Sequence, residues 1–240
     1  DFSLLEAAVA ECAWAGCDTI WIICNDDIGP LIKKKIGDFV GDPVWAYRKF
    51  DPFPNDSKRQ IPVYYVPIHP KDRDKRDCLA WSVLHGSLTV FKIADELSRW
   101  VVPNKYYVSF PYGYFPAWQL RTHRKTISSS KNFYISHQEK TFKDGLYSSF
   151  TFGKDEFIAF RKIIRTGTGR FRPGVDWQAH ESLPIEGRWS ARFFPIEKVF
   201  EPFKCDDANK IEVGEFWNIS NWNEYKQFLA DNVEKDIKRP

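Results

Sequence analysis

The sequence predicts an α/β fold with three layers, α/β/α, around a mixed and mainly parallel sheet. Apolar, strand-like runs alternate along the chain with helical patterns, which is typical of strand–helix–strand units. One of these runs, Thr19–Cys24, is apolar at almost every position and lies between two predicted helices. A strand of that kind is covered on both faces. We therefore expect Thr19–Cys24 among the interior strands of the sheet.

Length and composition favour a single folded domain that spans residues 1–240. The 240-residue chain is 43% hydrophobic and 28% charged, a balance that argues against disorder. Its 35 basic and 32 acidic residues leave a net charge of only +3, which indicates no nucleic-acid partner. No apolar run approaches the roughly 20 residues that a membrane span needs, and no signal peptide is visible. We expect neither a nucleic acid nor a membrane as a partner.

The five cysteines are an odd number and include no C-x-x-C pair, which favours a reduced, structural state and a cytoplasmic location. Two of them, Cys12 and Cys24, lie in apolar patterns, where cysteine behaves as a small hydrophobic residue. The sequence contains no methionine. We therefore expect that residues precede Asp1 and that an N-terminal motif can lie among them.

The first forty residues predict a helix, a strand, a loop and a second helix in succession. A capping box beginning at Ser3 starts the first helix, and Gly16 is suited to end it. The strand Thr19–Cys24 follows, and a short basic helix then runs to Ile36. This succession sets the fold and the sheet edge at which a ligand is expected.

The remaining elements continue the alternation of strands and helices. In the middle of the chain, we expect an irregular segment over Gly37–Arg59, a strand over Ile61–Ile68, and a helix from Cys78 to about Trp100 that Asp77 caps. A strand over Lys105–Phe110 and a helix from Pro116 to Arg124 follow. The last third predicts a hairpin of Asn132–His137 with Lys140–Lys143, a helix over Asp155–Arg165, a flexible lobe at about 166–189, a strand over Val213–Ile219, and a helix from Trp222 that Asn221 and Glu224 cap.

A polar loop follows the buried strand Thr19–Cys24. In open α/β sheets, ligands bind outside the carboxyl ends of the strands, and Asn25, Asp26 and Asp27 stand at such an end. These side chains are suited to hold a cation or a ribose. Alternatively, one aspartate caps the following helix, whose N-terminus favours negative charge.

Two further groups of candidate site residues follow predicted strands. Arg76, Asp77 and Ser82 surround the start of a helix, where a guanidinium and free amides could bind phosphate, although Asp77 is equally suited to be only a cap. Tyr112 and Gly113 follow the Lys105–Phe110 strand, where the tyrosine could stack on a base or sugar. Turn chemistry explains the Pro111–Gly113 segment equally well.

Three other kinds of chemistry have no support in the sequence. The histidines are dispersed, which argues against a zinc site. No G-x-S-x-G or Walker pattern is present, so a serine hydrolase or a P-loop protein is not indicated.

Taken in order, several segments resemble the sugar-1-phosphate nucleotidyltransferases, also called nucleoside-diphosphate-sugar pyrophosphorylases. The opening "A-G-x-D-x-I-x-I" pattern of that family corresponds here to Ala15–Ile22, and its closing "W-x-D-I-G-T-x-E-x-Y" segment is similar to Phe216–Tyr225. Between them, Pro62–Ile68, Arg76–Gly86 and Lys105–Gly113 resemble the strands and the helix of the nucleotide-contacting edge. The resemblance implies the GT-A-like nucleotidyltransferase architecture.

The resemblance also implies a chemistry. A nucleotidyl group would pass from a nucleoside triphosphate to a sugar-1-phosphate, with Mg²⁺ as cofactor. The family holds its metal with one aspartate after the central strand and another in the closing segment. Here these positions carry Phe110–Gly113 and Asn218, and a neutral amide is a much poorer magnesium ligand than a carboxylate. Asp26, Asp27 or Asp77 could substitute for these carboxylates.

Three hypotheses follow: an active nucleotidyltransferase, a degenerate relative that only binds a nucleotide or sugar, or an interaction protein that reuses the fold. For the third, the 10 Trp and 20 Phe could form a surface for a protein partner or a second copy, or could lie in the core. We expect Asn25, Asp77, Tyr112, Gly113 and Asn218 to converge on one cleft, and the 240-residue chain to turn substrate over very slowly or not at all.

Overall fold

The computed structural model describes residues 3–46, 59–69, 78–97, 102–167 and 194–237, with side chains to residue 231. Within these residues the fold is mixed α/β, as the alternation of strands and helices predicts. The candidate residues Arg76 and Asp77, and the predicted lobe at 166–189 from residue 168 onward, lie outside the described residues. No helix of the described part is both long and apolar enough to cross a bilayer.

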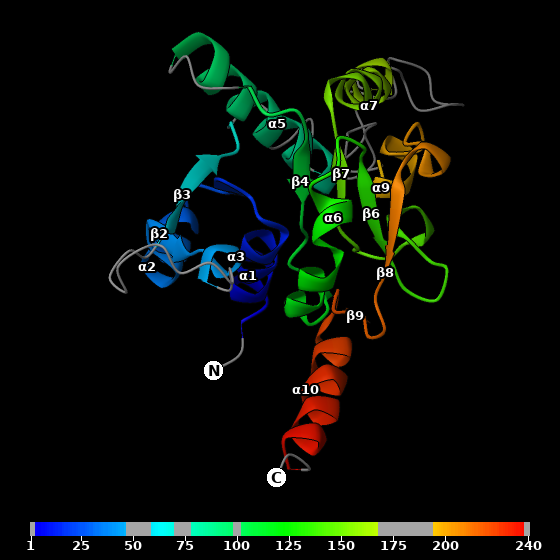
Figure 1. Ribbon diagram of the computed structural model, residues 1–240. Coiled ribbons are helices and arrows are strands. Elements are labelled where there is room, and N and C mark those ends of the chain that lie inside the picture. Colours follow the sequence, from blue (N-terminus) through cyan, green and yellow to red (C-terminus); the bar gives the residue numbers. More distant parts are fainter. Residues whose placement is uncertain (1–2, 47–58, 70–77, 98–101, 168–193, 238–240) are drawn as a thin grey trace, which may run out of the picture.

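The N-terminal third forms a small sheet of three strands, on the left in Figure 1. Strand β3 (Gln60–Pro67) lies in its middle, with β1 (Ile20–Cys24) on one side and β2 (Phe39–Gly41) on the other. The β1–β3 pair is parallel and the β2–β3 pair is antiparallel. β2 and the short helix α3 (Pro43–Ala46) fall where the sequence predicts an irregular excursion, because a three-residue strand is too short to show an alternating pattern.

A second sheet has the strand order β4–β7–β6–β8, and a separate pair joins β5 to β9. Their bounds are β4 (Tyr106–Val108), β7 (Phe150–Phe152), β6 (Phe133–Ser136), β8 (Asn209–Glu212), β5 (Gly113–Tyr114) and β9 (Trp217–Asn218). Only β6 and β8 are parallel; the other pairs are antiparallel. The sequence predicts neither β7 nor this position of β8.

The prediction of one mainly parallel sheet with β1 in its interior is corrected. Of the six strand pairings in the described part of the chain, two are parallel and four are antiparallel. Within the described residues, β1 pairs with β3 alone, so it ends its sheet on the side that faces β4. A continuous apolar run shows that both faces of a strand are covered, but it carries no information about the direction or the number of its neighbours.

Two helices cover opposite faces of the strands. Helix α1 (Leu4–Ala15) has Ser3 as its N-cap and ends at Gly16, whose φ of 82° is the left-handed conformation that glycine adopts readily. Helix α5 (Leu79–Lys92) continues into a π-helical turn, η1 (Ile93–Leu97). Successive residues of β4 show the arrangement, because Val108 packs in the cluster of α5 while Tyr107 packs against the cluster of α1.

The described residues form several further helices. They are α2 (Gly29–Ile36), the 3₁₀ helix η2 (Ala117–His123) with α6 (Arg124–Ile127), η3 (Phe142–Asp144), α7 (Lys154–Gly167), α9 (Ile196–Val199), η6 (Cys205–Asp207) and α10 (Trp222–Ile237). The predicted hairpin reduces to a single bridge between His137 and Lys140, because β6 pairs with β7 and β8 instead.

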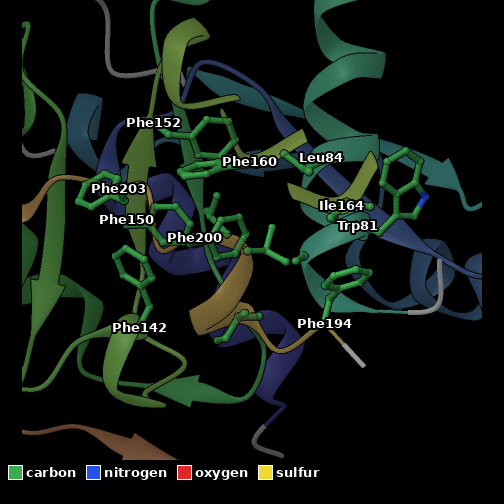
Figure 2. Close-up of a cluster of buried hydrophobic side chains, with 14 of the residues drawn as sticks. Trp81, Leu84, Phe142, Phe150, Phe152, Phe160, Ile164, Phe194, Phe200 and Phe203 are labelled. Carbon is green, nitrogen blue, oxygen red and sulfur yellow. The ribbon is translucent and has the colours of Figure 1, made fainter. Parts of the chain in front are cut away.

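Phenylalanine dominates the largest core cluster, which lies between the second sheet and α5, α7 and α9 (Figure 2). Phe150 is fully buried, and its ring stacks on that of Phe142 with 4.0 Å between centroids. The rings of Phe152, Phe160 and Phe200 are also fully buried. Many of the aromatic residues therefore serve the core, which is one of the two alternatives that the composition leaves open.

Candidate functional site

The structure brings three of the predicted site residues together at the β5–β9 pair. Gly113 of β5 is directly opposite Asn218 of β9. The carbonyl of Tyr112, just before Gly113, accepts a 2.7 Å hydrogen bond from the amide of Ile219, just after Asn218. Tyr112 and Asn218 are therefore neighbours, and the expectation that they converge on one cleft with Asn25 and Asp77 stays a prediction.

Asn218 and Gly113 both have structural roles beside the loop before β7. The Asn218 amide accepts a 3.0 Å hydrogen bond from the Tyr147 backbone N–H and donates a 3.0 Å hydrogen bond to the Gly145 carbonyl. It thereby clamps the loop before β7. A Cβ on Gly113 would collide with the Tyr147 carbonyl oxygen and lie 2.9 Å from the Phe216 ring. The close approach of the loop requires glycine here.

Tyr112 is the member of this group that a ligand can reach. Its side chain is 37% exposed, and its ring lies 5.2 Å from the ring of Tyr147 in a tilted arrangement. Burial raises the pKa of the Tyr147 phenol, which therefore stays neutral at physiological pH. The two aromatic rings at this edge provide a surface on which a base or a sugar can stack.

The loop between β1 and α2 holds the other acidic candidates. The Asn25 carbonyl accepts a 2.9 Å hydrogen bond from the Gly29 amide, and the Asp27 carboxylate accepts one of 3.0 Å from the Ile28 amide. Asp27 thus binds the N-cap residue of α2 rather than capping the helix from the N-cap position. Asp26 is exposed. Among the described residues, no group of three or more His, Cys, Asp or Glu side chains is arranged to hold a metal ion.

The start of α5 differs from the prediction in its capping residue. Cys78 occupies the N-cap position, and its sulfur accepts a 3.4 Å hydrogen bond from the Trp81 amide. Ser82 lies one turn further on, and its hydroxyl donates a long, 3.5 Å hydrogen bond to the Cys78 carbonyl. Because a thiol is a weak acceptor, the first turn of α5 is only weakly capped.

A cavity of about 590 Å³ separates the two sheets. Strand β1 forms one wall through Thr19–Ile23, and the segment Lys105–Pro111, which includes β4, forms the other. Side chains of α1 and α5 line it as well, among them Val9 and Val83. Ser82 also lines the cavity, so the first turn of α5 borders the same space as β1 and the segment that includes β4.

Both wall strands begin at the same end of this cavity. Lys105, just before β4, donates hydrogen bonds of 2.8 and 2.7 Å to the carbonyls of Ile127 and Ser129. Arg124, in the same short helix as Ile127, donates hydrogen bonds of 2.9 and 3.0 Å to the carbonyls of Trp14 and Ala15, just before β1. β1 and β4 therefore run in the same direction, and their carboxyl ends share an edge.

A buried carboxyl group, which the sequence patterns do not single out, joins α1 to the second sheet. Glu11 is only 4% exposed, and its carboxylate accepts a 2.5 Å hydrogen bond from the Tyr107 hydroxyl and another from the Ser149 hydroxyl. Burial is the largest influence on this group and raises the pKa of Glu11 to about 7, although the hydrogen bonds act in the opposite direction. A charged residue inside the apolar spacing of α1 is the signal by which Glu11 could have been found.

No protein-family model matches this sequence, and no curated protein matches it significantly. The functional argument therefore depends on the geometry of the chain itself.

Proposed function

We propose that the chain is a nucleotidyltransferase-like protein of three-layer, GT-A-like architecture, which binds a nucleoside triphosphate and a sugar phosphate at the edge where β1 and β4 end. One observation carries the proposal: Ile23 near the end of β1, Ser82 in α5, and Pro111 after β4 line the same cavity. Ligands of open α/β proteins bind outside the carboxyl ends of the strands, where the order of the strands reverses.

The groups at this edge suit the parts of a nucleotide. Tyr112 offers an exposed aromatic face to the base. The weakly capped first turn of α5 offers backbone amides and the Ser82 hydroxyl to phosphate oxygens, because a helix N-terminus attracts negative charge.

A second candidate function is nucleotide binding without turnover. The position at which the resemblance places a metal-binding carboxylate is Asn218, and both ends of its amide are already engaged by backbone groups. A magnesium ligand at this position would have to break the clamp on the loop before β7. Asn218 therefore does not fit a metal-binding role, and we derive no catalytic step through a magnesium ion.

Titration calorimetry with the four nucleoside triphosphates in magnesium buffer tests the proposal. We expect saturable binding of at least one of them in the micromolar to millimolar range. Tyr112→Ala should weaken it about tenfold, since stacking on an aromatic side chain is worth about 1–3 kcal/mol per base. Phe39→Ala is the matched control, because Phe39 is an exposed aromatic side chain of β2, in the other sheet.

The outcomes separate the two candidate functions. Binding together with pyrophosphate release in the presence of sugar-1-phosphates supports the transferase, and binding without release supports the degenerate binder. Absence of binding up to millimolar concentrations, or equal loss in Tyr112→Ala and Phe39→Ala, would refute both.

A further inference from the structure

Two cysteines, Cys12 and Cys17, meet where α1 ends. The helix ends in a Schellman motif, in which the Gly16 amide donates a 3.0 Å hydrogen bond to the Ala13 carbonyl. The Cys17 amide donates the second bond of the motif, of 3.2 Å, to the Cys12 carbonyl. Side chains at these two positions of a Schellman motif frequently touch each other. The turn at the end of α1 therefore places the two cysteines side by side.

The two thiols interact with each other. A hydrogen bond with the Cys17 side chain is the largest influence on the Cys12 thiol and raises its pKa well above the ordinary value, and burial acts in the same direction. A disulfide needs two cysteines whose Cα atoms lie within roughly 7 Å and whose side chains point toward each other. The backbone hydrogen bond and the interacting thiols indicate that this pair has such a geometry. Both cysteines are free in the structure.

The surroundings of the pair give one thiol better access to solvent than the other. Cys17 lies between two exposed residues, Gly16 and Asp18, whereas both neighbours of Cys12 in the chain are buried. Both cysteines line the cavity between β1 and β4, and both pack against buried residues of α1, β1 and β3. A reagent from solvent therefore reaches Cys17 first, and Cys12 lies behind it.

We propose that Cys12 and Cys17 form a redox-modification site, at which a small-molecule disulfide such as oxidised glutathione converts the two thiols into an intramolecular disulfide. This site is separate from nucleotide binding and does not depend on it. The alternative is that the two side chains serve only as the apolar contact of the Schellman motif.

The reaction proceeds in two exchange steps. The Cys17 thiolate attacks one sulfur of the oxidant, so that a mixed disulfide forms and one glutathione thiolate leaves. Cys12 then loses its proton, and its sulfur attacks the Cys17 sulfur and releases the second glutathione thiolate. The protein gives up two electrons and two protons, and the oxidant becomes two molecules of reduced glutathione.

Peptide mapping by mass spectrometry gives the first test. The 240-residue chain is equilibrated with oxidised and reduced glutathione at a series of ratios, the remaining thiols are alkylated, and the chain is digested with chymotrypsin. Cleavage after Trp14 and Trp21 places Cys12, Cys17 and Cys24 in three different peptides. We expect the first two peptides to be recovered as one linked species that reduction separates, and the Cys24 peptide to be alkylated at every ratio.

The same titration in urea tests whether the fold brings the thiols together. Because the Schellman motif holds them side by side, half of the folded chains should be linked at a ratio at least about tenfold less oxidising than in urea. Near-ultraviolet circular dichroism verifies that the chain stays folded without urea. Absence of the linked species from the folded chain, equal ratios in the two conditions, or linkage of either cysteine to Cys24 would overturn the proposal.

Single variants test the order of the two steps. Cys12→Ser should trap glutathione on Cys17 at least about tenfold faster than Cys17→Ser traps it on Cys12, because exposure makes cysteine oxidation selective for the site. Cys205→Ser, at another half-buried cysteine, is the matched control and should leave the linked fraction unchanged. Equal trapping in the two variants, or a lower linked fraction in Cys205→Ser, would overturn the assignment of this pair and its order of reaction.

Discussion

The two sheets of this protein differ in how completely they are packed. The second sheet lies against a cluster of sixteen buried residues that includes eight phenylalanines. Among the described residues, the corresponding cluster of the first sheet has five buried members, Val9, Ala13, Ile20, Ile61 and Val63, and none of them is aromatic. The first sheet also borders the cavity that separates β1 from β4.

This difference indicates which part of the chain contributes most to its free energy of unfolding. Free energy from burial grows with the apolar area that is removed from water, so the phenylalanine cluster should dominate it (Figure 2). The first sheet, which has the smaller buried cluster, should open at lower free energy than the second. The functional proposals concern the boundary between the two.

The largest effect on stability is expected from a substitution in the core of the second sheet. Phe150→Ala should lower the free energy of unfolding by about 4 kcal/mol, because it leaves a large cavity among fully buried rings. Ile22→Ala, at a half-buried position on the wall of the cavity between β1 and β4, should cost only about 1 kcal/mol. Urea unfolding followed by circular dichroism measures both. Equal costs would contradict the unequal packing of the two sheets.

The second prediction concerns Glu11, which joins the two regions. Its pKa is raised to about 7 in the folded state from an ordinary value of 4.5. Between these pH values the folded chain keeps a proton that the unfolded chain has lost, so stability falls as pH rises through this window. The fall should reach about 3 kcal/mol and be complete above the folded pKa.

Urea unfolding between pH 4 and pH 8 measures this dependence. Glu11→Gln keeps an acceptor for Tyr107 and Ser149 but cannot ionise, so it should remove most of the fall. Glu6→Gln is a matched control at an exposed glutamate of the same helix. A profile of Glu11→Gln that is as steep as that of the wild type would contradict the role of Glu11.

The third prediction compares two glycines, one in each region. Gly113→Ala should cost about 2 kcal/mol, because its Cβ collides with the Tyr147 backbone and the loop must shift. Gly41→Ala in β2 has no atom within 4 Å of the added Cβ and should be nearly neutral. Thermal unfolding by calorimetry distinguishes them. A neutral Gly113→Ala would show that the loop before β7 is not held at this distance.

The smallest expected effect compares the caps of the first and last helices. Asn221 accepts 3.0 Å hydrogen bonds from the amides of Asn223 and Glu224, whereas Ser3 accepts a longer one, of 3.5 Å, from the Glu6 amide. Asn221→Ala should therefore cost about 1 kcal/mol and Ser3→Ala about half of that. Urea unfolding of the two variants measures the difference. The reverse order would show that capping distance does not rank these two helix ends.

Local pattern sufficed for the elements whose signals are continuous in the chain. The cap at Ser3, the stop at Gly16, the apolar run of β1 and the cap at Asn221 all have the structures that the sequence predicts. Helix caps, periodicity and strand runs depend on neighbouring residues, so they can be seen without the fold.

Pairing between distant strands was decided by the tertiary structure alone. β7 lies at the centre of the second sheet, yet its three residues, Phe150–Phe152, are too few to show a period. β6 pairs with β7 and β8 rather than in a local hairpin, because those partners complete a buried core. Strand direction and neighbours follow from packing over long range, which no local pattern encodes.

The same limit applied to the candidate site. From the sequence, Asn218 is only a residue at a family position and Glu11 only one acidic residue of a helix. The structure makes the first a clamp on the loop before β7 and the second a buried link between α1 and the second sheet. Residue types could be predicted from the sequence, but the hydrogen-bond partners and the burial that determine their chemistry arise only when distant segments pack together.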